Sequence, residues 1–179
     1  MLYRPLPHPP PAPRKTIMLL ALLVRTLTKK TQYSLRALYA LTRAGGRSLL
    51  IADLARQENI PKRFLEQILL KLKAKGLVTS KKGKGGGYML AKDPHEVTVG
   101  QVIRLIEGPL APLPCASETA YRKCDACVDE RFCETRLIMR RVRDEMARVL
   151  DGITLADACR RADEARSETQ QSDALMYYI

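Results

Sequence analysis

Four of the five cysteines in this 179-residue chain lie in one short stretch, spaced Cys115-x8-Cys124-x2-Cys127-x5-Cys133. Thiolates are soft ligands that suit iron–sulfur clusters and zinc. Nothing else in the chain resembles a secreted disulfide framework, and clustered cysteines in an intracellular protein indicate a metal, a cluster or redox chemistry. The fifth, Cys159, lies among alanines and is expected to be a small buried side chain.

Three interpretations of this cysteine loop remain open on spacing and chemistry. An iron–sulfur cluster, with two or four iron atoms, uses thiolate ligands of this kind. Structural zinc is the alternative metal, although only Cys124 and Cys127 form the close pair that zinc sites usually show twice. A thiol switch without metal is the third, because Arg122, Lys123 and Arg131 favour reactive thiolates beside them.

Three successive helices are predicted ahead of a β-hairpin, and a fourth, capped by Thr98, is predicted between the hairpin and the cysteine loop. Apolar spacing indicates helices over residues 32–43 and 48–59. Pro61 can open the third helix, where its missing N–H costs nothing, and Gly76 can end it in the left-handed conformation. Phe64, near its start, is expected to be buried. The buried stripe of this helix is predicted to be Leu65, Ile68, Leu69 and Leu72.

A β-hairpin is predicted after the helices, with strands over residues 78–80 and 88–90 and a turn containing four glycines between them. Three helices followed by a hairpin is the order of a winged helix-turn-helix. The predicted fold class is therefore mainly α with a small β-hairpin. It consists of a winged helix-turn-helix DNA-binding domain over 28–108 and a long dimerisation helix.

The cysteine loop is expected to span 109–133, with the dimerisation helix and a terminal helix over 134–163. The long helix carries an apolar stripe of Ile138, Val142, Met146 and Val149. Pairing with a second subunit would bury this stripe, whereas folding back on its own domain is the alternative. The polar residues 164–179 are expected to form a flexible tail.

Positive charge is concentrated ahead of the cysteine loop. Residues 29–92 carry 15 basic and 3 acidic side chains, whereas residues 93–179 carry 12 basic and 16 acidic ones. This distribution indicates a face for a polyanion such as double-stranded DNA. The candidate contacts on the third helix and the hairpin turn are Lys62, Arg63, Glu66, Gln67, Lys71, Lys81, Lys82 and Lys84.

Several motifs in one order carry a family resemblance. They are Gln32–Leu38 (QYSLRAL), Ile60–Leu69 (IPKRFLEQIL), Lys82–Leu90 (KGKGGGYML) and Ile153–Asp157 (ITLAD). The chain resembles the IscR- and NsrR-type winged-helix transcriptional regulators of the Rrf-two family over roughly residues 28–162. The resemblance implies a homodimer that binds a palindromic operator, with the last helix packed on the partner. Lys82 stands where the family usually has arginine.

The resemblance also implies ligands for an iron–sulfur cluster. Cys115, Cys127 and Cys133 fall on the three cysteine positions that hold it in the family. Some members use a histidine three residues after the last cysteine as the fourth ligand, and Arg136 occupies that position here. Cys124 is the local substitute, and a residue of the partner subunit is the other possibility.

Other function classes find little support. His8 and His95 have no partner at triad or ligand spacing, and the chain shows no nucleotide loop or nucleophile elbow, so neither an enzyme nor a small-molecule substrate is expected. The Pro-rich and apolar extension over 1–27 is expected to be disordered or not native, and its apolar run is too short for a membrane span. The prediction is a cytoplasmic regulator that senses cluster status, nitric oxide or redox state; a redox or electron-transfer protein is the alternative.

Overall fold

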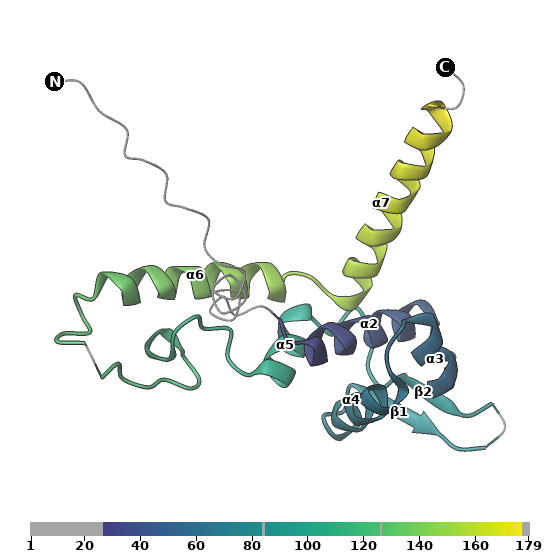
Figure 1. Cartoon of the computed structure of the whole chain (residues 1–179), viewed down its shortest axis with the longest axis horizontal. Coiled ribbons are helices and arrows are strands. Elements are labelled where there is room, and N and C mark those ends of the chain that lie inside the picture. Colours follow the sequence, from purple (N-terminus) through teal and green to yellow (C-terminus); the bar gives the residue numbers. More distant parts are fainter. Residues whose placement is uncertain (1–26, 84, 126, 177–179) are drawn as a thin grey trace, which may run out of the picture.

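The computed structural model describes residues 27–83, 85–125 and 127–176. Its elements in chain order are α2 (Lys29–Arg43), α3 (Ile51–Gln57), α4 (Lys62–Ala74), β1 (Val78–Lys81), β2 (Gly87–Leu90), α5 (Val99–Glu107), the short 3₁₀ helix η1 (Pro114–Ala116), α6 (Glu134–Asp151) and α7 (Leu155–Met176). Figure 1 shows α2, α3, α4 and the hairpin gathered at one end, with α6 and α7 reaching away from them. Apart from Leu27, the extension predicted over 1–27 lies outside the described residues.

The core lies between α2, α3 and α4. Leu38, Leu54 and Leu69, one from each helix, are completely buried. Burying a leucine side chain stabilises a fold by about 1.5–3 kcal/mol, so these apolar stripes favour the packing of the three helices against one another. Helix α2 begins three residues before the predicted start, because the Thr28 side chain accepts a hydrogen bond from the Thr31 backbone N–H at 3.3 Å and caps it.

Helix α3 is shorter than predicted because the residue before its N-cap pairs with the hairpin. The Leu49 N–H donates to the Tyr88 carbonyl at 2.8 Å, and the Tyr88 N–H returns the bond to the Leu49 carbonyl at 2.8 Å. The backbone at Leu49 is therefore extended, and the helix starts only at Ile51. This bridge attaches the hairpin to the helical core.

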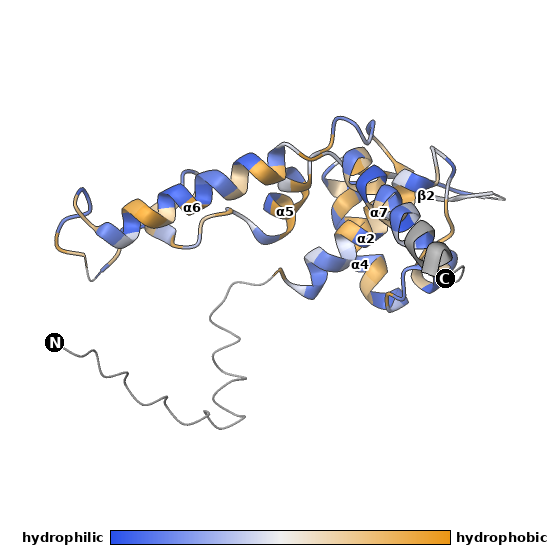
Figure 2. Cartoon of the chain, turned by 90° about the horizontal axis from the view of Figure 1, so that it is seen from above, coloured by the Kyte–Doolittle hydropathy of each residue, from blue (hydrophilic) through white to orange (hydrophobic). Residues whose placement is uncertain are grey.

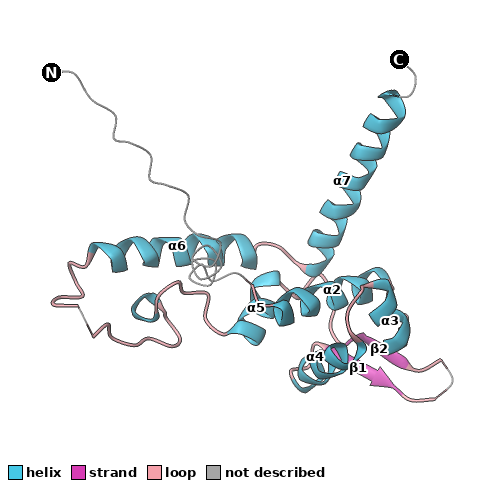
Figure 3. Cartoon of the chain, in the orientation of Figure 1, coloured by secondary structure: helices cyan, strands magenta, loops and turns pink. Residues whose placement is uncertain are grey.

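The β-hairpin has the predicted strands and follows α4 directly. Gly76 ends α4 with a φ of 69°, and the buried Leu77 donates its N–H to the Leu72 carbonyl at 3.0 Å. Strands β1 and β2 are antiparallel, with Val78 opposite Leu90. Figure 3 shows this hairpin at the outer edge of the helical cluster. The winged helix-turn-helix architecture is therefore confirmed.

Helix α5 begins with a reciprocal capping box. The Thr98 hydroxyl accepts a hydrogen bond from the Gln101 N–H at 3.1 Å, and the Gln101 side-chain oxygen accepts one from the Thr98 N–H at 3.2 Å. Two backbone donors that lack helical partners are thereby satisfied. The cap predicted at Thr98 is confirmed.

Replacing Thr98 with alanine is expected to lower the free energy of unfolding by about 1 kcal/mol, because it removes this cap. Urea unfolding monitored by circular dichroism measures the change. Thr98→Ser keeps a hydroxyl and is expected to stay near the wild-type value. An alanine variant as stable as the wild type would contradict the prediction.

Helix α6 presents two different faces. Arg143 is buried and donates to the Ala116 carbonyl of η1. Ile138, Val142 and Val149 lie on another face and are 58%, 39% and 53% exposed. Figure 2 shows apolar and polar residues alternating along this helix. These three residues of the predicted stripe therefore do not fold back onto their own domain, whereas the fourth, Met146, is half-buried.

Helix α7 continues to Met176, through much of the segment predicted to be a flexible tail. Thr154 and Asp157 cap its start, and the hydrogen bond from the Thr154 hydroxyl lowers the pKa of Asp157 to about 2. Arg160 pairs with both Asp157 and Glu164. Pairs at three- and four-residue spacing support a helix even where its surface is polar, and here they favour continuing α7 past residue 163.

Candidate nucleic-acid interface and cysteine site

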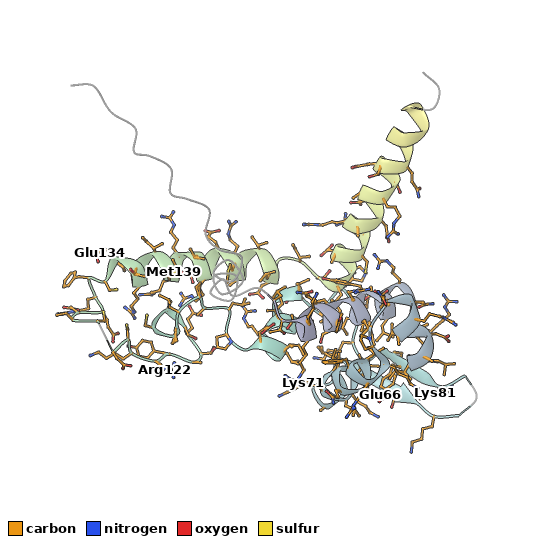
Figure 4. The ribbon with its side chains drawn as sticks, in the orientation of Figure 1. Glu66, Lys71, Lys81, Arg122, Glu134 and Met139 are labelled. Atoms are coloured by element: carbon orange, nitrogen blue, oxygen red, sulfur yellow. The ribbon has the colours of Figure 1, made fainter. Side chains whose placement is uncertain are left out.

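Helix α4 exposes four of the five residues predicted on it to contact nucleic acid. Its buried stripe is Leu65, Ile68, Leu69 and Leu72, as predicted. Exposed on other faces are Lys62, Arg63, Glu66 and Gln67. Figure 4 shows Glu66 and Lys81 along the lower edge of the domain in this view, and Lys73 of α4 donates to the Ser80 hydroxyl of β1 at 2.6 Å, so the helix and the hairpin are adjacent.

Two residues of α4 are not placed as the sequence suggested. Phe64 is 55% exposed, so the prediction that it is buried is wrong. It lies one position before the stripe that begins at Leu65, and its ring therefore points outward. Lys71 is half-buried, and its ammonium donates to the Ile106 carbonyl at 3.4 Å, which ties α4 to the last turn of α5.

The hairpin turn carries exposed Lys81 and Lys82, whereas the predicted contact Lys84 lies outside the described residues. The Gly86 N–H donates to the Gly83 carbonyl at 2.8 Å, and the Ser48 hydroxyl donates to the Gly85 carbonyl at 2.7 Å. The turn is therefore held both internally and against the segment before α3.

The four loop cysteines all line one open cavity of about 420 Å³. Cys115 is buried in η1, Cys133 is the residue directly before α6, and Cys124 and Cys127 lie between them in the loop. The Cys127 N–H donates to the Cys124 carbonyl at 3.3 Å, which forms a tight turn between this pair. Tertiary structure thus brings together thiols that are up to 18 positions apart in the sequence.

The thiols have not converged on a single point. Within residues 27–83, 85–125 and 127–176, no three Cys, His, Asp or Glu side chains are arranged to hold one metal ion. The four-cysteine donor set around a shared cavity fits an iron–sulfur cluster chemically.

The positively charged side chains near the cysteines were expected to lower the pKa of nearby thiols, but the pKa of Cys127 is raised. Burial and a hydrogen bond with Cys133 raise the pKa of Cys127, which disfavours its thiolate. Arg131 pairs with the Asp129 carboxylate at 2.8 Å, so its charge is compensated locally. These surroundings do not support the prediction of a cation-activated thiolate at Cys127.

Two arginines of α6 that sequence reasoning did not select hold the backbone of the loop. Arg136 donates to the Cys115 carbonyl at 3.0 Å and to the Glu130 carbonyl at 3.2 Å. Arg143 donates to the Ala116 carbonyl at 2.6 Å. Their seven-residue spacing, which places both on one helix face, was the available sequence signal.

Cys159 stands apart from the loop. It is buried in α7 against α2, with its Sγ 3.7 Å from the Tyr39 carbonyl oxygen, and burial raises its pKa. The prediction of a small buried side chain is confirmed.

These features define a winged helix-turn-helix DNA-binding protein with an attached cysteine-lined site. The chain belongs to the Rrf2 family, described as iron-dependent transcriptional regulators, whose family-wide sequence pattern matches residues 27–161. It is therefore a DNA-binding transcriptional regulator and not an enzyme. The family resemblance carried by the four motifs is confirmed.

Individual relatives agree with this assignment. The chain is 42% identical to a protein of Rhodobacter capsulatus described as an rrf2-like HTH-type transcriptional regulator, covering 73% of this chain and 90% of that protein. It is 30% identical to the HTH-type transcriptional regulator CymR of Bacillus subtilis, covering 86% and 99%. The solved structure of T. potens IscR superposes with a TM-score of 0.62 at 30% identity, covering 80% of this chain and 93% of that one. Among the described helices, none is long and apolar enough to cross a bilayer.

Proposed function

We propose that this regulator binds an iron–sulfur cluster through Cys115, Cys124, Cys127 and Cys133, and that cluster status, nitric oxide or redox state sets its affinity for DNA. The observation that carries the proposal is the single cavity lined by all four cysteines. A cluster held there would supply a centre that oxidants or nitric oxide can alter.

The positions of the cysteines suggest how the signal reaches the rest of the protein. Cys115 belongs to η1, and Cys133 directly precedes α6. If thiolates from both bound one group, they would hold η1 and the start of α6 at a fixed separation. Loss of the group would release this constraint and would shift the equilibrium between arrangements of α6 and the DNA-binding domain.

The proposed DNA contacts are the exposed residues of α4 and the hairpin turn. In the major groove, Glu66 can accept a hydrogen bond from a cytosine amino group, and Gln67 can pair with adenine. Lys82 is suited to the negative minor groove. The proposed phosphate or base contacts that complete the set are the exposed Lys62, Arg63 and Lys81, together with the half-buried Lys71, whose ammonium also contacts the Ile106 carbonyl, and Lys84, which lies outside the described residues.

The exposed stripe of α6 supports a homodimer. Ile138, Val142 and Val149 form an apolar face on a helix that extends away from the helical core. Contact with the same face of a second copy would remove this surface from water. We propose a cytoplasmic homodimer whose two α4 helices read the halves of a palindromic operator.

Purification without oxygen tests the proposed function. The expected product is coloured, contains iron and sulfide, and binds its operator with an affinity that changes when the iron is removed. A colourless protein that contains no iron and still switches its operator affinity would overturn the cluster assignment. Zinc in place of iron would indicate the zinc-stabilised alternative.

A thiol switch without metal is the second candidate, because Cys127 and Cys133 line the same cavity. Their oxidation by a peroxide would join the two sulfurs, while the two thiol hydrogens and two electrons reduce the peroxide. Peptide mapping that finds a Cys127–Cys133 disulfide in iron-free protein, together with altered operator binding, would favour this alternative.

Replacing Lys82 with alanine is expected to weaken operator binding and to make its salt dependence shallower. One phosphate contact contributes about 0.9 to the slope of log affinity against log salt concentration. Fluorescence anisotropy over a salt series measures this slope. Lys123→Ala removes an equal charge from the cysteine loop and should leave the slope unchanged, and an unchanged slope for Lys82→Ala would remove Lys82 from the interface.

A further inference from the structure

We infer that Arg136 and Arg143 are positioning residues that hold the cysteine loop against α6 and couple the state of the loop to the DNA-binding domain. The inference rests on the proposed function, because it names the residues through which the cysteine site is regulated. Both residues project from the face of α6 that covers the loop, seven residues apart.

Arg136 connects the two sides of the loop. Its Nε donates to the Cys115 carbonyl at 3.0 Å, and its Nη1 donates to the Glu130 carbonyl at 3.2 Å. Its guanidinium also lies 6.0 Å from the centre of the Tyr121 ring, and the Tyr121 hydroxyl donates to the Glu130 carboxylate at 2.5 Å. One side chain thus fixes the backbone on both sides of Cys124 and Cys127.

The chemistry of Arg136 allows it to position the loop but not to act as a metal ligand. A guanidinium has only donors and stays protonated, so it cannot act as a metal ligand at the position where some relatives have histidine. Its planar fork can donate to two carbonyls at once, whereas a lysine ammonium is a compact charge on a flexible stem. The structure therefore gives this position a role different from that of a fourth ligand.

Arg143 fastens the buried end of the loop. Its side chain is only 10% exposed and donates to the Ala116 carbonyl at 2.6 Å, next to Cys115. The charge is compensated by Glu118 at 3.1 Å and by the neighbouring Asp144. Burial of a charge is tolerated where it is paired and hydrogen-bonded in this way, so the contact is specific.

The other end of α6 is fastened to the DNA-binding domain. Arg104 of α5 makes two hydrogen bonds to the Asp151 carboxylate, at 2.5 and 2.8 Å. Gly100 permits this approach, because a Cβ there would lie 2.0 Å from Asp151 Oδ1. The last turn of α5 in turn accepts the Lys71 ammonium of α4 at the Ile106 carbonyl. Loop, α6, α5 and the exposed helix α4 are therefore linked by successive polar contacts.

The test compares Arg136→Met and Arg143→Met with Arg140→Met, which removes the same charge from an exposed position on α6. Hydrogen–deuterium exchange of iron-free protein is the first measurement. Backbone amides near residues 115–120 and 130 are expected to lose about tenfold in protection in the two test variants, the effect of losing one charge-assisted hydrogen bond. The control should match the wild type. Equal exchange in all three variants would overturn the inference.

Operator affinity is the second measurement, made on iron-loaded and iron-free forms of each protein. The ratio of the two dissociation constants is expected to fall toward one in Arg136→Met and Arg143→Met, while Arg140→Met keeps the wild-type ratio. An unchanged ratio in loaded test variants would overturn the coupling. A wild-type protein without iron would instead overturn the proposed function, and the exchange comparison would still decide whether the arginines hold the loop.

Arg136→Lys keeps the charge and serves as a second variant in case Arg136→Met fails to fold. Its ammonium is expected to hold one carbonyl without bridging both, so that protection near Cys115 and Glu130 recovers only in part. Full recovery would show that charge alone suffices and would overturn the bridging role of the guanidinium.

Discussion

Cys127→Ser protein purified without oxygen is expected to contain less than about a tenth of the wild-type iron per subunit. Serine oxygen is a harder ligand than thiolate and suits iron–sulfur chemistry poorly. Replacing residues that merely support metal ligands already costs about 10–100-fold in affinity, so loss of a ligand should cost at least as much. Iron analysis and the visible absorption spectrum measure the effect, and operator affinity should match that of the iron-free wild type.

Cys159→Ala is the matched control, because this thiol is buried against α2 and lies outside the cavity. It should retain the full iron content. Cys124→Ser tests the four-thiolate set separately and is expected to lose iron as Cys127→Ser does. Full iron in Cys124→Ser, with loss in Cys127→Ser, would move the fourth ligand to another residue, and full iron in both would contradict the proposed site.

Gly87→Ala is expected to lower the free energy of unfolding by about 3 kcal/mol and to abolish operator binding. Gly87 has a φ of 142°, and a Cβ there would lie 2.3 Å from the Leu49 carbonyl oxygen and 2.6 Å from the Leu49 carbonyl carbon. Both are backbone atoms of the bridge that attaches the hairpin, so they cannot move aside as a flexible side chain would. Backbone strain and overpacking each cost about 1–3 kcal/mol.

Gly76→Ala separates these two costs. Gly76 also has a positive φ, 69°, but no atom lies within 4 Å of the position that a Cβ would take. This variant should lose only about 1 kcal/mol through backbone strain. Chemical unfolding and operator binding of both variants provide the comparison. If Gly87→Ala is no less stable than Gly76→Ala, the close approach to Leu49 is not essential to the fold.

Much of the DNA-binding half follows from local sequence. The apolar period of α4 determined which residues it buries, and Thr98 followed by Gln101 determined how α5 begins. Both signals operate within one or two helical turns, so they are visible without knowledge of the fold. The type and order of these elements, with the basic charge around them, were sufficient to indicate the winged helix-turn-helix.

The start of α3 and the end of α7 show where local patterns were insufficient. Leu49 reads as helical by its neighbours, yet it pairs with Tyr88, 39 positions later. The part of α7 beyond residue 163 reads as irregular because it lacks an apolar stripe, although ion pairs of Arg160 with Glu164 and of Arg166 with Asp163 support the helix where this part begins. In both cases, interactions other than the apolar period determined the conformation.

At the cysteine site, too, some features follow from the sequence and others only from the tertiary structure. The sequence by itself determined the ligand chemistry, because residue type and number decide whether soft thiolates are present. Only the tertiary structure decided that all four cysteines line one cavity, that Arg131 is engaged by Asp129, and that Arg136 holds Cys115 and Glu130. Chemical type belongs to each residue alone, whereas a shared cavity depends on how α6 packs over the loop, which no local pattern encodes.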